Sequence, residues 1–267
     1  MPEHPSISLD TFLGNRLATS VRVGSLWVPA NYVERAFARY VNRPLYFSES
    51  GKLMYLLGSA SNISIAGRFF VVCCKHQLSD VQVQHVLFST EQDFRFRNGE
   101  RFVFADTPED KDFEQRDDLC FFDVTSAVLD GRLNAANFFS IDGDLALSAS
   151  DDPIAFVVRG FAFDDNTVQV PDDFESDFSI SGVHGVNRSF VCLEHDDSSD
   201  QTLLCLLRGE EFGISVNGFS GAPAFALVYL SDGFISSKFA GLVARGGGRS
   251  FYIIRAKFVH DFLTGAL

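Results

Sequence analysis

One serine in the C-terminal third of the chain stands among unusually small residues. Ser220 lies in the run Gly213-Ile-Ser-Val-Asn-Gly-Phe-Ser-Gly-Ala-Pro223, and a β-like segment follows it. A serine hydroxyl attacks a carbonyl carbon once a neighbouring base takes its proton. Gly218 lets the backbone bend so that its own N–H and that of Ser220 can point at the negative oxygen formed in such an attack. The run therefore predicts a nucleophile with an oxyanion hole made by Gly218 and Ser220.

A histidine and an aspartate earlier in the chain have the side chains that such a nucleophile needs. His76 follows the apolar run 68–74, and imidazole is the side chain best suited to exchange a proton near neutral pH. Asp118 immediately precedes a second apolar run. A carboxylate beside the imidazole can accept the Nδ1 hydrogen bond and fix the tautomer. Asp106, Asp117 and Asp123 compete for this role, and only Asp117 is close in register. In an extended segment its side chain should point the opposite way from that of Asp118.

The order histidine, aspartate, serine, in these local contexts, resembles that of the trypsin/chymotrypsin-like serine peptidases. Four segments carry the resemblance: Val72-Cys-Cys-Lys-His76, Asp118-Leu-Cys-Phe-Phe, Gly218-Phe-Ser220-Gly-Ala-Pro223 and Gly241-Leu-Val-Ala-Arg-Gly246. Asp118 follows His76 by 42 positions and Ser220 follows Asp118 by 102. This spacing is similar to that of a family in which one barrel holds the histidine and aspartate and a second holds the serine. The resemblance covers residues 53–262.

The resemblance implies a serine endopeptidase that works through an acyl-enzyme, without a cofactor or a metal. His76 would take the proton of Ser220 and pass it to the leaving amine, while Asp118 stays ionised. By alignment with the family, the substrate-binding residues are Ile214, Asn217, Ala244, Arg245 and Gly246. Ile214 would lie near the base of the primary specificity pocket, where it places no charge. A preference for lysine or arginine is therefore not expected.

Two departures from the family pattern concern how such an enzyme would be switched. Gln77 follows His76 where the family has a disulfide-forming cysteine, and Phe219 replaces the aspartate that pairs with a newly freed N-terminus in zymogen-activated members. The resemblance is therefore to intracellular bacterial or viral-type members without disulfides. The alternative function is a catalytically silent or partner-activated barrel that acts as a binding or regulatory module. An α/β-hydrolase is not expected, because its triad runs in the order serine, acid, histidine.

Short β-rich runs punctuated by glycine, asparagine and aspartate follow one another from Leu53 onward, and predict an all-β fold. With the family resemblance, the expected architecture is two six-stranded antiparallel β-barrels of chymotrypsin type. The expected parts are an N-terminal helical extension over residues 1–50, a first barrel over 51–130 and a second barrel over 131–267. Apolar residues at helical spacing predict a helix over 29–41, and a short helix over 257–263 is expected to close the chain.

The composition limits the partners and the compartment. A net charge of −13 repels phosphate backbones, so no nucleic-acid partner is expected. The expected partners are a protein or peptide substrate and a regulatory protein that docks on residues 1–50. No stretch approaches the roughly 18 apolar residues that span a bilayer, so no membrane association is expected. Five cysteines without metal-binding spacing, and no secretory signal, predict a cytoplasmic protein.

Overall fold

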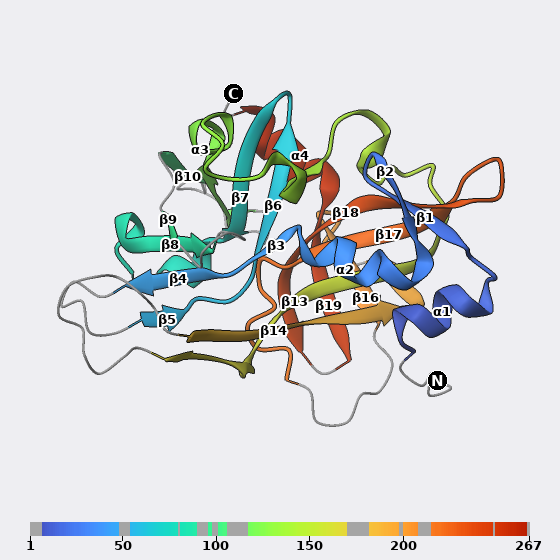
Figure 1. Cartoon of the computed structure of the whole chain (residues 1–267), viewed down its shortest axis with the longest axis horizontal. Helices are drawn as coiled ribbons and strands as arrows, with labels where there is room; N and C mark the ends of the chain where they lie inside the picture. Colours follow the sequence, from blue (N-terminus) through green and yellow to red (C-terminus); the bar gives the residue numbers. More distant parts are fainter. Residues whose placement is uncertain are drawn as a thin grey trace.

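The computed structural model describes residues 7–47, 54–79, 81–89, 96–97, 101–105, 117–169, 182–197, 200–207, 215–247 and 249–265. These ranges are mostly β-strand (Figure 1). Neighbouring strands pair antiparallel, except for β1 (Ser20–Val23) with β18 (Ile235–Gly247) and β12 (Phe139–Ser140) with β6 (Ala60–Ile65). No helix in this part of the chain is long and apolar enough to cross a membrane. The expected all-β double-barrel architecture is confirmed.

The first barrel consists of two sheets joined by one broken strand. Its strands are β3 Val41–Asn42, β4 Pro44–Phe47, β5 Met54–Leu56, β6 Ala60–Ile65, β7 Arg68–Cys74, β8 Val86–Ser89, β9 Phe96–Arg97, β10 Arg101–Phe104 and β11 Leu119–Asp123. One sheet has the order β10-β11-β7-β6-β12 with β3 paired to β6, and the other has the order β5-β4-β8-β9. Only Arg43 separates β3 from β4, so one stretch of chain passes between the sheets and bends them around a shared interior.

Alternation along β7 and β11 explains why phenylalanines occur in adjacent pairs. Phe122 and Cys73 point into the interior of the first barrel. Phe121 and Phe70 point to the opposite face, where they join the core that lies between the barrels. Successive side chains of a strand point to opposite faces, so a strand covered on both sides is apolar throughout. The Phe121-Phe122 pair therefore fills two separate cores.

The second barrel closes on itself. Its strands are β13 Pro153–Gln169, β14 Gly182–Cys192, β15 Glu194–Asp197, β16 Leu203–Leu207, β17 Pro223–Tyr229, β18 Ile235–Gly247 and β19 Ser250–Arg255. They pair in the order β14-β13-β17-β18-β19-β16-β15, and β15 begins two residues after β14 ends, so the last strand continues the first. Large rings from Phe156, Phe190 and Phe251 fill the interior opposite small residues such as Ala224 and Ala240.

The N-terminal segment packs on the second barrel. Its elements are α1 Leu9–Asn15, β1 Ser20–Val23, β2 Leu26–Pro29, η1 Ala30–Tyr32 and α2 Val33–Ala38. Strand β1 pairs with β18, and the ring of Phe37 stacks on Phe225 with 4.4 Å between centroids. The helix expected over 29–41 is shorter than the periodicity indicates, because Val41 pairs with Ser61 of β6 and starts the first barrel. The divisions at residues 50 and 130 stay predictions.

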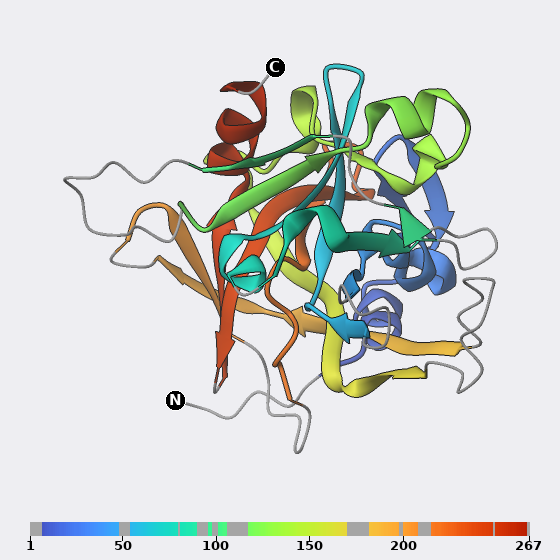
Figure 2. The same cartoon turned by 90° about the vertical axis from the view of Figure 1, so that its left-hand side faces the viewer.

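Two further segments connect and close the barrels. The connection holds α3 Thr125–Leu129, η5 Ala135–Asn137, β12 Phe139–Ser140 and η6 Gly143–Leu145. The expected C-terminal helix is present as α4, Ala256–Gly265, drawn in red at the end of the chain in Figure 2. The Phe262 ring of α4 meets Phe121 of β11 edge-on, with 5.4 Å between centroids. A helix that leaves the second barrel therefore packs on the first.

Candidate active site

The pairing of β7 with β11 brings His76 and Asp118 together. Leu119, the first residue of β11, pairs with Cys74, the last residue of β7. The Lys75 N–H then donates to the Asp118 carbonyl at 3.1 Å, which extends the ladder by one step. His76 follows in the short 3₁₀ helix η2, Lys75–Leu78. The carboxyl group of Asp118 therefore lies beside the start of this helix.

The Asp118 carboxylate holds His76 at two atoms. Oδ1 accepts the backbone N–H of His76 at 2.8 Å, and Oδ2 lies 2.6 Å from the ring nitrogen Nδ1. The Asp118 side chain is 8% exposed, whereas that of His76 is 51% exposed. A carboxylate only accepts, so Nδ1 carries the ring proton and Nε2 of the neutral imidazole keeps a free lone pair. The bond to Asp118 therefore fixes the tautomer of the His76 imidazole.

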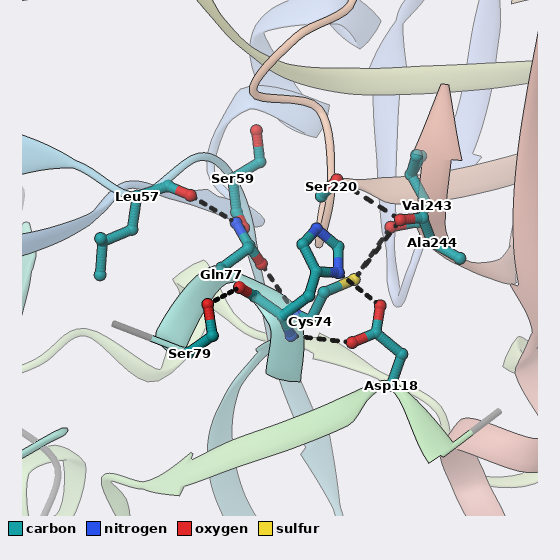
Figure 3. Close-up of polar contacts among 10 residues, drawn as sticks. Leu57, Ser59, Cys74, Gln77, Ser79, Asp118, Ser220, Val243 and Ala244 are labelled. Carbon is teal, nitrogen blue, oxygen red and sulfur yellow. Dashed lines mark hydrogen bonds and ion pairs between the residues drawn. The ribbon is translucent and has the colours of Figure 1, made fainter. Parts of the chain in front are cut away.

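Ser220 comes from the second barrel, in the loop that leads into β17. Its Oγ donates to the Ala244 carbonyl of β18 at 3.4 Å, as the close-up shows (Figure 3). Within the described ranges no hydrogen bond joins Oγ to the His76 ring. All three side chains line one cleft of about 470 Å³. The structure thus brings His76, Asp118 and Ser220 to one cavity, two of them from one barrel and the third from the other.

Hydrogen bonds to its carbonyls fix the turn around the candidate nucleophile Ser220, residues 217–222, which is called the nucleophile turn below. The Asn217 carbonyl accepts from the Phe163 N–H at 2.8 Å, and the Phe219 carbonyl accepts from the Ala222 N–H at 2.9 Å. In a trans peptide the N–H points away from the C=O, so the N–H groups of Gly218 and Ser220 are turned to the opposite side. Neither N–H has a hydrogen-bond partner among the residues that the structure describes. Gly218 permits this path because its φ is +98°. The turn therefore offers two donors, the N–H groups of Gly218 and Ser220.

Phe219 anchors the same turn in the second barrel. Its side chain is fully buried, and its ring lies 5.3 Å from that of Phe190 and 5.6 Å from that of Phe251. A Cβ on Gly160 would lie 2.7 Å from the Phe219 ring, so glycine is needed there to admit it. The residue between the two candidate oxyanion donors is thus held by apolar packing.

Four of the five expected substrate-binding residues line the cleft: Asn217, Ala244, Arg245 and Gly246. Ile214 lies outside the described residues. The Arg245 guanidinium lies over the Tyr252 ring, with Cζ 4.4 Å from the centroid, which keeps the charge at the cleft rim.

Sequence reasoning missed two lining residues, Phe163 and Val216. Phe163 reaches the site from the long strand β13 and has no sequence signal of its own. Val216 follows Ile214 by two positions, so the same alignment could have included it.

Cys74 lies next to the Asp118 carboxylate. Its Sγ donates to the Val243 carbonyl at 3.3 Å, and burial together with the charge of Asp118 raises the pKa of this thiol (Figure 3). Ligand atoms of Cys74, His76 and Asp118 lie within 4.8 Å of one another. Zinc binds a thiolate, and the raised pKa of the Cys74 thiol opposes that form, while Asp118 already bonds His76 at two atoms. The group suits a hydrogen-bonded dyad better than a metal site.

No protein-family model matches the chain, and no curated protein matches it in sequence. Among solved structures it is similar to the scabies mite inactivated protease paralogue S-D1, with a TM-score of 0.50 and 10% identity over 86% of this chain and 94% of that one. For the scabies mite inactivated protease paralogue S-I1 the TM-score is 0.47, with 10% identity over 86% and 95% of the two chains. A chain from work on the intrinsically disordered Sesbania mosaic virus VPg protein gives 0.44, with 12% identity over 83% and 89%. At such identities the likeness concerns the fold alone, a double β-barrel of chymotrypsin type.

Proposed function

We propose that this chain is a serine endopeptidase that hydrolyses peptide bonds through an acyl-enzyme, with Ser220 as nucleophile, His76 as base and Asp118 as the group that orients the base. One observation carries the proposal. Asp118 holds His76 at two atoms, at 2.8 and 2.6 Å, on a cleft that Ser220 lines from the other barrel. This arrangement leaves Nε2 free to act as the proton acceptor.

The chemistry then proceeds in two halves. Nε2 of His76 takes the proton of Ser220 while Oγ forms a bond to the substrate carbonyl carbon, whose oxygen becomes negative. The N–H groups of Gly218 and Ser220 bind that oxygen, and one such donor is typically worth about 3 kcal/mol of barrier. His76 next gives its proton to the amine as the peptide bond breaks. Water repeats the sequence on the ester and restores the serine.

An attacking geometry requires Ser220 Oγ to leave its bond to the Ala244 carbonyl. The bond from Ser220 Oγ to the Ala244 carbonyl is 3.4 Å long, well beyond the 2.7–2.8 Å of a strong hydroxyl hydrogen bond. In that geometry the hydroxyl would exchange this weak acceptor for Nε2 of His76. Catalytic hydrogen bonds often tighten only when substrate is bound.

Hydrolysis of a diverse peptide mixture tests the proposal. The wild type should produce new termini, and Ser220→Ala should lower turnover by about a million-fold while leaving the fold intact. Ser140→Ala, a serine that bonds Asp142 away from the cleft, is the matched control and should keep the wild-type rate. Cleavage by Ser220→Ala at the wild-type rate would reject Ser220 as the nucleophile.

A second candidate is a silent or partner-activated barrel that serves as a binding or regulatory module. The observation that favours it is the hydroxyl of Ser220, which bonds Ala244 and not the imidazole. A regulatory partner would dock on residues 1–50, where Trp27 and Tyr32 are each 51% exposed. Folded protein that cleaves nothing alone but cleaves peptides when a partner is added would favour this candidate.

We further propose that the protein works in a reducing compartment, as a cytoplasmic protein does. All five cysteines are free, and Cys73 and Cys120 stand directly opposite each other on β7 and β11 without a disulfide. A hydrogen bond with Cys120, together with burial, raises the pKa of the Cys73 thiol. Thiols that stay protonated are poor nucleophiles for disulfide exchange. Mass measurement after alkylation of the unfolded protein should find five thiols.

A further inference from the structure

We infer that Gln77 and Ser59 are positioning residues that form one hydrogen-bonded bridge between the helix that carries the base and the nucleophile turn. Neither residue is one of the three proposed catalytic residues. The inference rests on the proposed function, because it says how His76 and Ser220 are kept in register across the cleft.

Gln77 ties helix η2 to the loop between β5 and β6. Its Nε2 donates to the Leu57 carbonyl at 2.9 Å and to the Ser59 carbonyl at 3.2 Å (Figure 3). Its Oε1 accepts the backbone N–H of Cys74 at 2.7 Å. Since Gln77 directly follows His76, these three bonds fix the backbone that carries the imidazole relative to Ser59.

Ser59 ties the same loop to the nucleophile turn. It is fully buried, its N–H donates to the Ser220 carbonyl at 3.2 Å, and its Oγ donates to the Gly218 carbonyl at 2.8 Å. The same Oγ accepts the N–H of Phe161, a strand residue of the second barrel, at 2.9 Å. One residue of the first barrel therefore holds the carbonyls of both proposed oxyanion donors.

Glycines on both sides make room for the bridge. A Cβ on Gly58 would lie 2.4 Å from Nε2 of Gln77, and a Cβ on Gly221 would lie 2.2 Å from the Ser59 carbonyl and 2.9 Å from Oε1 of Gln77. Their φ values are +125° and +80°, which L side chains rarely adopt. The backbone at Gly58 and at Gly221 thus approaches the Gln77 amide and the Ser59 peptide closely.

The bridge acts on the rate of attack. It runs from the residue after His76, through Ser59, to the carbonyls of Gly218 and Ser220, without passing through substrate. Reacting groups lose rate steeply when misplaced, and a shift of about 1 Å costs on the order of 100-fold. Loss of the bridge should therefore slow the bond-forming step and leave initial binding of a small probe unchanged.

The test measures labelling by a fluorophosphonate probe as a function of probe concentration, which separates the maximal rate kinact from the apparent affinity KI. The variants are Gln77→Glu, which keeps the acceptor and loses both donations, Gln77→Met, which loses all three bonds, and Ser59→Ala. We expect kinact to fall by about 10- to 100-fold with KI unchanged. Asn62→Asp is the matched control, because Asn62 is a buried amide of β6 that bonds Asn42 and the Arg39 carbonyl away from the cleft. It should lower the unfolding midpoint and leave kinact at the wild-type value.

The outcomes separate the bridge from the proposed function. Folded wild type that takes no label would reject the proposed function itself. If the wild type is labelled and the Gln77 variants have the same kinact as the wild type, the bridge is overturned. The bridge is also overturned if Asn62→Asp and Gln77→Glu lower the unfolding midpoint by the same amount and lower kinact by the same factor. The two variants of Gln77, a half-buried residue, decide the matter if Ser59→Ala does not fold.

Discussion

Replacement of Asp118 by asparagine tests the proposed base most selectively, because it exchanges one carboxylate oxygen for an amide nitrogen of the same shape. In the wild type both oxygens accept, one from the backbone N–H of His76 at 2.8 Å and one at Nδ1 at 2.6 Å. The asparagine oxygen can keep only one of these bonds. If it keeps the backbone N–H, its NH₂ group faces Nδ1 and can only donate.

The consequence for the imidazole is a change of tautomer. Nδ1 must then become the acceptor, so the ring proton moves to Nε2, the atom that should take the proton of Ser220. We expect turnover to fall by about 10⁴, which corresponds to about 5.5 kcal/mol in activation free energy. In the opposite orientation of the amide, its NH₂ group would face the backbone N–H of His76, which is also a donor. The wild-type Asp118 side chain is only 8% exposed, so two donors facing each other there are disfavoured.

Fluorophosphonate labelling and peptide hydrolysis near neutral pH both measure the effect. The matched control is Asp123→Asn, the same exchange in a buried carboxylate at the other end of β11, where Asp123 bonds Arg68 and the Thr125 N–H. Asp123→Asn should lose stability and keep its labelling rate. If Asp118→Asn labels as fast as the wild type, Asp118 does not set the tautomer of His76 and the reasoning is wrong.

Three further predictions concern the nucleophile turn and the response to acid. Phe219→Ala should lower the free energy of unfolding by about 3–5 kcal/mol, measured by urea titration, because it empties a buried aromatic site; a loss below about 1 kcal/mol would contradict the anchor. Gly218→Ala should slow labelling by about 100-fold, since its φ is +98° and a Cβ would lie 2.6 Å from a backbone carbonyl; an unchanged rate would reject it as an oxyanion donor. Burial acts to raise the pKa of Asp123, but hydrogen bonds from Thr125 and Arg68 outweigh it and hold that pKa below its ordinary value of 3.8. The stability this adds is present above 3.8 and is lost as the pH falls through the folded pKa, so Asp123→Asn should flatten the acid limb of a plot of urea midpoint against pH.

The fold and the candidate triad were accessible from the sequence because strand patterns are local. The apolar run 68–74 has the same bounds as strand β7, so the place of His76 just beyond a strand end could be predicted. Pro223 likewise opens β17, directly after the small residues around Ser220. The hydrogen bond between His76 and Asp118 then follows from the pairing of two adjacent strands.

The bridge could not be predicted in the same way, because its bonds join distant parts of the chain. Ser59 reaches Gly218 across 159 positions, and nothing in local periodicity sets how one barrel docks on another. The small residues Gly58-Ser59-Ala60 are a weak signal of close backbone approach. Gln77 was identified only as a departure from the family pattern, whereas its three hydrogen bonds appear only in three dimensions.

The helix expected over 29–41 shows the same limit. Its apolar spacing is real, and Val33, Ala36, Phe37 and Tyr40 are all buried. The α-helix nevertheless ends at Ala38, because pairing of Val41 with β6 takes over the end of the segment. Tertiary pairing overrides a local pattern where a strand begins two or three residues later.

The most direct test of the proposed triad is fluorophosphonate labelling of the wild type, with the adduct located by peptide mass mapping, beside Ser220→Ala and His76→Ala. The account predicts one adduct, on Ser220, that is absent from both variants while all three proteins stay folded. Folded wild type without an adduct, or an adduct that forms equally fast in His76→Ala, would contradict it.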